Sequence, residues 1–317
     1  MTQASAIQWQ NPREKIWGFH VHQELPLTDF AESLVIQEMC ADFMQKHHIP
    51  IDANDALLPG YGPHLDYMWE LRVESLKQQA LEKMGLAISY MAINRFGLSG
   101  YIHPLMQNIC LSDEEVMLAE GNENQPNAIW FTYKVPQYQE FFFNPPRDSN
   151  NKIMDTRTSR IMPAADIHHL KAVGRNNLKN LPFRDPKDVI IRGFHIHMDY
   201  EPEQKILALA IFDNFLRYLS SENMHPTSTR IYEPNDNGPH LLAGWEVKFE
   251  TGNSRILERI GIAIGWLMCN RQNLSVFMHP VTWEEGDYAE ELKAHKEYSF
   301  FLGILPDLDL TFFSNKI

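Results

Sequence analysis

The sequence of 317 residues is poor in cysteine and in basic residues, and it has no long apolar run. Its three cysteines, Cys40, Cys110 and Cys269, lie far apart without CxxC spacing, which argues against a disulfide framework and a thiolate zinc site. Asp and Glu (41) outnumber Lys and Arg (28), giving a net charge of −13, so no nucleic-acid partner is expected. No apolar stretch approaches the roughly 18 residues of a membrane span, and the first residues lack the layout of a signal peptide. We therefore expect a soluble, cytoplasmic protein without a membrane partner.

What the chain does contain is a long internal repeat. The pentapeptide GFHVH at positions 18–22 returns as GFHIH at positions 193–197. Three further motifs return at nearly the same spacing: GPH of 62–64 at 238–240, Trp-Glu of 69–70 at 245–246, and Asn-Arg of 94–95 at 270–271. This period is much longer than the unit of a solenoid, so it indicates one domain that has been duplicated and fused.

The repeat also sets the expected domain boundaries. We expect a first repeat over residues 1–143, a linker over 144–188 and a second repeat over 189–317. The linker is rich in Pro, Asn and Arg, and it predicts at most a short helix over 164–173.

The apolar pattern within each repeat predicts the element order βαββαβ. In GFHIH the apolar residues alternate with His195 and His197, which is the period-2 pattern of a half-buried strand. Apolar residues at helical spacing follow over 209–219 and 256–267, and the turn-rich stretch 233–240 between them predicts a hairpin. This order is typical of an α+β fold, here two ferredoxin-like domains in tandem, each with both helices on one face of an antiparallel sheet.

The predicted sheets each leave one face without helices. Because strand side chains alternate, the paired histidines point to that face together with Tyr101 and Phe277. An uncovered face with aromatic rings favours burial against a partner. We therefore expect the two repeats to pack face to face as an intramolecular pseudo-dimer of antiparallel sheets. Association of whole chains into a homo-oligomer is left open.

Histidines carry the chemistry of the repeat. Eight of the 14 histidines fall at four repeated positions, and these are His20, His22, His64 and His103, then His195, His197, His240 and His279. Two histidines at i and i+2 on a strand project side by side, close enough for one metal ion to reach both. The remaining histidines, such as His225, have no partner in the other repeat, and we interpret them as structural or surface residues.

The four repeated positions have different expected roles. We expect His22 with His64, and His197 with His240, to be the surest metal ligands. His20 and His195 are each a third ligand or a catalytic proton shuttle. His103 and His279 are ligands or, if the antiparallel strands carry them toward the other end of the sheet, substrate or structural groups.

Two other pairs of repeated residues are candidates for contact with a substrate. Glu70 and Glu246 share the histidine face and fit a carboxylate ligand, a substrate contact or an exposed strand residue. Arg95 and Arg271 fit the binding of a substrate carboxylate, or the closing of a helix at its negative end.

The motifs together resemble the DOPA 4,5-dioxygenase family. The second repeat is similar nearly from end to end, through HIHMDYE, GPH, NRQNLSVFMHP and GDYAEELKAHKEYSFFLG, the last of which contains His295. The first repeat is similar through HVHQE, GPH and NRFGLSGYIHP, then departs after Pro104 and has no equivalent of His295. The family's GPHP is GPHL in both repeats, with Leu65 and Leu241 as the last residues.

The resemblance implies extradiol cleavage of a catechol, such as DOPA or a related aromatic, by non-haem Fe(II) and O₂. It also implies a small aromatic substrate beside the metal, with His295 among the residues that bind it. Two alternatives stay open from the residues alone. Imidazole ligands suit Zn²⁺ as well as Fe(II), so a zinc-binding, non-oxidative protein is one. A regulatory binding module on the same scaffold is the other.

Overall fold

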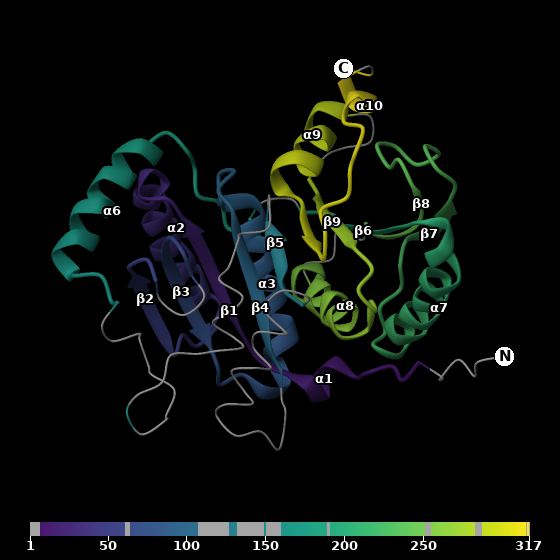
Figure 1. Cartoon of the computed structure of the whole chain (residues 1–317), viewed down its shortest axis with the longest axis horizontal. Helices are drawn as coiled ribbons and strands as arrows, with labels where there is room; N and C mark the ends of the chain where they lie inside the picture. The colour runs from purple at the N-terminus through teal and green to yellow at the C-terminus, as the bar shows by residue number, and fades with distance from the viewer. Residues whose placement is uncertain are drawn as a thin grey trace.

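The computed structural model describes residues 7–60, 64–106, 127–131, 149, 160–188, 191–250, 255–282, 287–314 and 316. Cys110, the Gly-Pro of the first GPH motif and most of the predicted linker before residue 160 lie outside these residues. The chain forms two halves that lie side by side, the first at the left and the second at the right of Figure 1.

The first half contains two long helices and four principal strands. Its elements are α1 (Pro12–Lys15), β1 (Ile16–Leu25), α2 (Leu27–Lys46), β2 (Ala53–Leu57), β3 (Tyr67–Val73), η1 (Lys77–Gln79), α3 (Ala80–Asn94), β4 (Gly100–Met106) and β5 (Ile129–Phe131). The predicted strand with GFHVH and the two amphipathic helices are therefore confirmed.

The second half repeats this order and adds a C-terminal extension. Its elements are β6 (Gly193–Tyr200), η2 (Pro202–Gln204), α7 (Lys205–Ser221), β7 (Ser228–Tyr232), β8 (Ala243–Phe249), α8 (Ile256–Asn270), β9 (Val276–Val281), α9 (Tyr288–Lys293), η3 (Ala294–Tyr298), β10 (Phe300–Leu302) and α10 (Thr311–Ser314). Helix α6 (Ala164–Leu178) lies between the halves in sequence and packs on α2 of the first half, at the left of Figure 1. The predicted hairpin is β7–β8, and the helix predicted over 164–173 is α6, which extends to Leu178.

All ten strands in the described residues belong to one antiparallel sheet, which agrees with the predicted α+β class. The strand order is β2-β3-β1-β4-β5-β10-β9-β6-β8-β7, so the halves meet edge to edge at β5 and β10. The prediction of face-to-face packing is therefore wrong. The physical reason is that Phe131 pairs with Phe300 and Ile129 with Leu302, so the backbone hydrogen bonds of two edge strands are satisfied across the seam.

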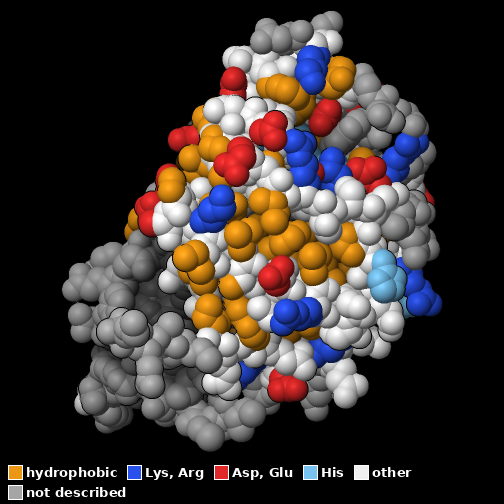
Figure 2. Space-filling view, turned by 90° about the vertical axis from the view of Figure 1, so that its right-hand side faces the viewer, with side chains coloured by type: hydrophobic (Ala, Val, Ile, Leu, Met, Phe, Trp, Pro, Cys, Tyr) orange, Lys and Arg blue, Asp and Glu red, His pale blue; other side chains and the backbone are white. Residues whose placement is uncertain are grey.

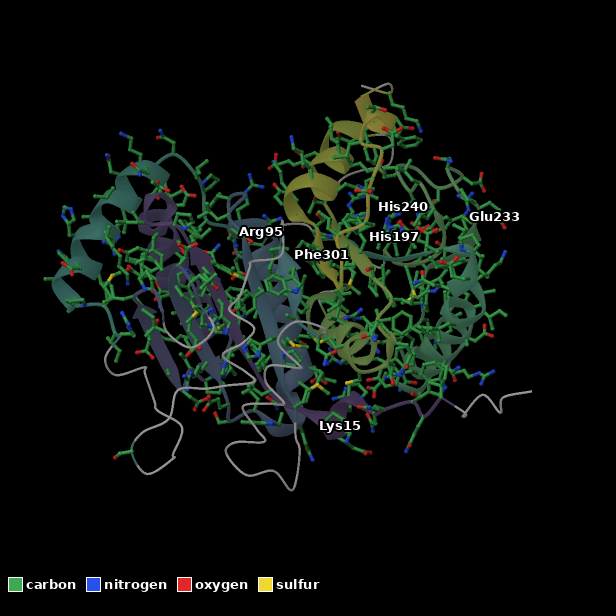
Figure 3. All side chains as sticks on the ribbon, in the orientation of Figure 1. Lys15, Arg95, His197, Glu233, His240 and Phe301 are labelled. Atoms are coloured by element: carbon green, nitrogen blue, oxygen red, sulfur yellow. The ribbon has the colours of Figure 1, made fainter. Side chains whose placement is uncertain are left out.

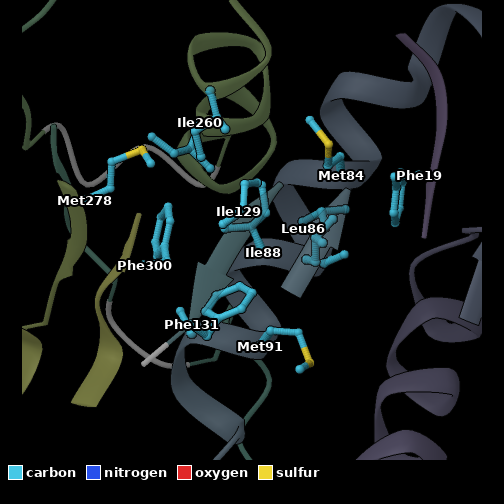
Figure 4. Close-up of a cluster of buried hydrophobic side chains, with 14 of the residues drawn as sticks. Phe19, Met84, Leu86, Ile88, Met91, Ile129, Phe131, Ile260, Met278 and Phe300 are labelled. Carbon is cyan, nitrogen blue, oxygen red and sulfur yellow. The ribbon is translucent and has the colours of Figure 1, made fainter. Parts of the chain in front are cut away.

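The core lies between the sheet and its helices, and it is continuous across the seam. Figure 4 shows Ile129 and Phe131 of β5 among side chains from both halves, including Phe300 and Met278. Helices α3 and α8 cross at Gly85 and Gly261, two glycines at equivalent positions of the repeats. A Cβ on Gly85 would lie 2.5 Å from the carbonyl oxygen of Leu257, and a Cβ on Gly261 would lie 1.9 Å from that of Leu81. Only glycine allows the two backbones this approach.

A side chain at Gly261 should therefore weaken the contact between the halves. We expect Gly261→Val to lower the free energy of unfolding by about 1–3 kcal/mol, the usual cost of overpacking, measured by denaturant or thermal unfolding. Ser220→Val, at an exposed position of α7, is the control for the cost of a β-branched residue in a helix. Equal stability losses in both variants would contradict a close helix crossing.

Each half also sends its N-terminal arm onto the other half. Gln10, before β1, exchanges two hydrogen bonds with the side chain of Asn270 in the second half, at 2.7 and 2.9 Å. Arg184, before β6, exchanges two with the side chain of Asn94 in the first half, both at 2.8 Å. In addition, Trp9 stacks on Trp266 at 5.6 Å between ring centroids. The repeated asparagine of the Asn-Arg motif therefore holds the opposite arm.

The two ends of the sheet differ in their cover. At the β2 end, Leu57 forms a bridge with Ile161, the amide of Met162 donates to Ala56, and α6 packs on α2. At the other end, four of the five residues of β7 are exposed. Figure 2 shows apolar side chains gathered among charged ones on the side of the molecule where α7 and β7 lie. No helix in the described part of the chain is long and apolar enough to cross a membrane.

Candidate metal centres

Strands β1 and β6 place the HxH motifs on the face of the sheet opposite the helices. Residues between the histidines, such as Val21 and Ile196, are fully buried in the main core. His103 on β4 pairs with His20 across the sheet, and His279 on β9 pairs with His195. The antiparallel register therefore does not separate His103 or His279 from the HxH motifs.

Two triads of histidines result, one in each half. Potential ligand atoms of His20, His22 and His103 all lie within 4.8 Å of one another, as do those of His195, His197 and His279. In the first triad the Nε2 atoms of His22 and His103 are 3.0 Å apart. Two nitrogens bound to one ion at about 2.0–2.1 Å each can be no more than about 4.2 Å apart, so this pair is close enough to share an ion.

The protonation of the triads also suits a metal. Burial first, and the neighbouring imidazoles second, hold the pKa of His22 and of His197 well below the ordinary value of 6.5. Burial does the same for the pKa of His103 and of His279. These rings are therefore neutral near pH 7, which is the form that binds a metal ion.

Unpartnered nitrogens provide a second test of the fit. Nδ1 of His22 and both ring nitrogens of His197 are buried without a hydrogen-bond partner among the described residues. A buried nitrogen without a partner is costly unless something else binds it. The residues present therefore fit a divalent metal ion in each half.

A carboxylate lies beside each triad, that of Glu70 in the first half and that of Glu246 in the second. Glu70 Oε2 is 3.8 Å from Nδ1 of His22 and 3.9 Å from Nδ1 of His20. Glu246 Oε1 is 3.6 Å from Nε2 of His197 and 3.8 Å from Nδ1 of His195. Both carboxylates are buried, and each also contacts a cationic side chain two residues further along its strand.

His64 and His240 lie next to the triads rather than within them. The His240 ring stacks on His197 at 4.2 Å, and Figure 3 shows these two residues side by side in the second half. Nδ1 of His240 is 2.9 Å from Oδ2 of Asp199, and Tyr232 donates to the other oxygen of Asp199 at 2.5 Å. A carboxylate only accepts hydrogen bonds, so Nδ1 of His240 carries the proton. Its Nε2 is buried and has no hydrogen-bond partner among the described residues.

The first half has a related pair. Nδ1 of His64 is 2.8 Å from Oε2 of Glu24, whose Oε1 accepts from the amides of Leu65 and Asp66 at 2.7 and 3.1 Å. Glu24 therefore fixes both the His64 ring and the backbone that follows it.

A further pair of carboxylates contacts the first histidine of each HxH motif. His20 Nε2 is 3.2 Å from Glu74, and His195 Nε2 is 2.7 Å from Glu250. These hydrogen bonds are the main cause that lowers the pKa of Glu74 and of Glu250.

The carboxylates that hold the histidines were missed by the sequence reasoning, although the sequence contained a signal for them. Glu24 and Asp199 each lie two positions after the second histidine of an HxH motif. Glu74 and Glu250 likewise occupy equivalent positions, each four places after the glutamate of a Trp-Glu motif. Acidic residues at equivalent positions of the repeats could therefore have been identified together with the imidazoles they orient.

The two sites differ in the aromatic residues around them. In the first half Tyr101 stacks on His22 at 4.7 Å, and the equivalent residue of the second half is Phe277. In the second half His295 lies on η3 with its ring centroid 3.9 Å from that of His279. Its Nδ1 donates to the carbonyl of Glu291 at 2.9 Å, and burial lowers its pKa to about 3. The sequence has no histidine between His103 and His168, so the corresponding stretch of the first repeat cannot supply this ring.

Arg95 and Arg271, for which the sequence allows either the binding of a substrate carboxylate or the closing of a helix, are buried and donate to backbone carbonyls. Arg95 donates to Leu98 at 3.5 Å, and Arg271 donates to the equivalent Leu274 at 2.5 Å. Burial lowers the pKa of each guanidinium to about 10. Each arginine follows the last residue of its helix, so closing the helix describes their contacts better than holding a substrate carboxylate.

Comparison with known proteins identifies a family, a sequence relative and a similar structure. The model of the Dopa 4,5-dioxygenase family matches residues 194–312. An uncharacterised 21.2 kDa protein of Botryotinia fuckeliana is 31% identical over 134 residues, which are 41% of this chain and 68% of that protein. The crystal structure of a Nostoc punctiforme protein named as a candidate dioxygenase is 22% identical, with a TM-score of 0.31 over 40% of this chain and 95% of that chain.

Proposed function

Because the chain belongs to the Dopa 4,5-dioxygenase family, we propose that it is a non-haem iron dioxygenase that opens the ring of a catechol by extradiol cleavage. Membership of the family supports a dioxygenase-type function. The observation that carries the finer proposal is the pair of buried histidine triads, each beside a carboxylate. In the second half the iron would be held by His195, His197 and His279, with a carboxylate oxygen of Glu246 nearby as a further ligand atom. In the first half the corresponding residues are His20, His22, His103 and Glu70.

The chain's own residues would handle the proton of the substrate. When bound, ferrous iron supplies open positions for the catechol oxygens and for O₂, and it lowers the pKa of the catechol hydroxyl. We assign the acceptor of that proton to Nε2 of His240, because Asp199 holds the ring in the tautomer that leaves this nitrogen free to accept. His195, predicted as a ligand or a proton shuttle, takes the ligand role in this proposal because it belongs to the triad.

We also propose that the chain is a fused pair of ferredoxin-like domains, residues 1–143 and 189–317, joined by a linker over 144–188. Counted outward from the β5–β10 seam, equivalent strands of the two halves follow in the same order. The contacts at the seam support this, since Gly85 meets the helix of Gly261 and Trp130 pairs with Phe301. Such reciprocal contacts are typical of an isologous dimer.

Metal analysis followed by oxygen consumption tests the proposed function. The full chain would be purified without added metal, analysed for its elements, loaded with Fe(II) and screened with catechols in an oxygen electrode. We expect bound iron, oxygen uptake with at least one catechol, a yellow ring-opened product and loss of activity after chelation. Bound zinc with no oxygen uptake by the iron-loaded chain would favour a zinc-binding, non-oxidative protein instead. If the iron-loaded chain shows no turnover, and replacing His64 and His240 changes only its melting temperature, the result would favour a regulatory binding module.

Removing the charge of Asp199 should impair the proposed proton acceptor. Asp199→Asn offers one oxygen to two donors, so either Tyr232 or His240 loses its acceptor. Partners that orient active-site histidines typically contribute 10–100-fold, so in a His22→Ala/His103→Ala background, where only the second triad is intact, we expect oxygen uptake to fall by about that factor. Asp213→Asn, on the exposed side of α7, is the matched control and should leave uptake unchanged. Equal rates in the two variants would rule out the role of Asp199.

A further inference from the structure

His295 lies in an uncommon type of helical turn. It belongs to η3, a five-residue π-helical turn between α9 and β10. Turns of this type are uncommon, and they occur frequently at functional sites. The turn carries the His295 ring to 3.9 Å from His279 of the second triad. The orientation of this fourth imidazole therefore depends on what holds the turn in place.

One side chain that holds the turn comes from the first half. The guanidinium of Arg95 donates to the carbonyl of Glu297 and, at 3.3 Å, to that of Ser299. Glu297 lies in the turn two residues after His295, and Ser299 is the residue that ends the turn. Arg95 is 1% exposed, and its Cζ lies 5.8 Å from the centre of the Phe131 ring on β5. Figure 3 shows Arg95 and Phe301 near the seam between the halves.

Arg95 makes two kinds of contact, and it shares one of them with Arg271, its counterpart in the second repeat. Arg95 and Arg271 both donate to the leucine carbonyl three residues further along, which closes the helix in each half. The hydrogen bonds of Arg95 to Glu297 and Ser299 come in addition, and they cross from one half to the other. Charge-assisted hydrogen bonds are stronger than neutral ones, so a buried guanidinium is well suited to fix two carbonyls.

We propose that Arg95 is a positioning residue for His295, so that the first half completes the metal centre of the second. The proposal deepens the proposed function, on which it rests only for the statement that the second site is reactive. Both residues of the Asn-Arg motif in the first repeat would then hold a segment of the second half in place. Asn94 holds the arm of the second half, and Arg95 holds its π-helical turn.

Cobalt spectroscopy of the full chain tests the proposal without requiring turnover. Co(II) would be added to a His22→Ala/His103→Ala background, in which only the second triad is intact. Arg95→Ala, His295→Ala and their combination would be compared, with Arg271→Ala as the matched control for the loss of a buried helix-closing arginine. The visible spectrum of Co(II), its affinity and the melting temperature would be measured for each.

We expect Arg95→Ala to shift the Co(II) spectrum in the same direction as His295→Ala and to weaken Co(II) binding by about 10–100-fold, as for other orienting partners. The double variant should equal His295→Ala, because residues that act through one another are not additive. Arg95→Lys keeps a positive charge and an ammonium group that can donate to a carbonyl, so it should restore part of the spectrum. Arg271→Ala should lower the melting temperature without shifting the spectrum.

Three results would overturn the proposal. The first is a melting temperature lowered by Arg95→Ala with an unchanged Co(II) spectrum. The second is a double variant whose effects are the sum of the single ones. The third is an unchanged spectrum in His295→Ala, which would remove His295 from the site. If the iron-loaded wild type consumes no oxygen with any catechol, the proposed function fails, while the cobalt spectra still decide the role of Arg95.

Discussion

Replacing His197 with alanine is expected to lower the metal content of the chain from two ions to one and to abolish oxygen uptake at the second site. His197 is central to its triad, since it lies near Glu246 and stacks on both His240 and His279. Loss of a partner that merely orients a ligand costs 10–100-fold in metal affinity, so loss of a ligand should cost at least about 100-fold. Elemental analysis and an oxygen electrode measure the two quantities.

The repeat supplies the matched variants for this experiment. His22→Ala should remove the ion of the first site and leave the second, and the double variant should hold no ion. His225→Ala, an exposed histidine without a partner in the other half, should keep both ions. A wild-type chain that binds one ion shared between the halves, or an unchanged metal content in His197→Ala, would contradict two independent centres.

The metal-free protein is expected to lose stability steeply on mild acidification. Burial lowers the pKa of five histidines in the folded chain, His295 to about 3 and the others well below 6.5, namely His22, His103, His197 and His279. The unfolded chain therefore binds more protons than the folded chain at every pH between these values and about 6.5. The stability that these groups contribute is fully present above pH 6.5 and is lost as the pH falls.

The size of this loss follows from linkage. Each group costs about 1.3 kcal/mol between pH 7 and pH 5.5, so five groups cost on the order of 6 kcal/mol, a large part of the usual 5–15 kcal/mol of a folded protein. Denaturant unfolding in the presence of a chelator measures it. His295→Gln should reduce the pH dependence by about one group, whereas His225→Ala should not. A flat stability between pH 7 and pH 5.5 would show that the triads are not buried as described.

The secondary structure and the common face of the histidines could be predicted from the sequence because both depend on local geometry. Alternation along GFHIH places His195 and His197 on one face whatever the rest of the chain does. The edge-to-edge seam could not be predicted, because β5 and β10 are three-residue strands outside the motifs that recur in both repeats. Their pairing depends on contacts between distant segments. A sequence repeat by itself is equally compatible with two sheets packed face to face and with two sheets joined edge to edge.

The sequence predicts which residues form the candidate site better than it predicts how they are arranged. The repeated histidines are all in or next to the two triads, but the register of β1 with β4 decides that His20, rather than His64, joins His22 and His103. The contacts of Arg95 depend on the other half of the molecule, so no pattern within its own repeat indicates them.

The difference between the two ends of the sheet has a consequence for association. An open-ended assembly built by strand pairing needs two free edges on every subunit, since each must accept one neighbour and offer an edge to the next. Here Ile161 pairs with Leu57 at the end of β2, whereas four of the five residues of β7 are exposed. Of the two outer strands in the described part of the chain, β7 is therefore the one better placed to pair with a strand of another chain.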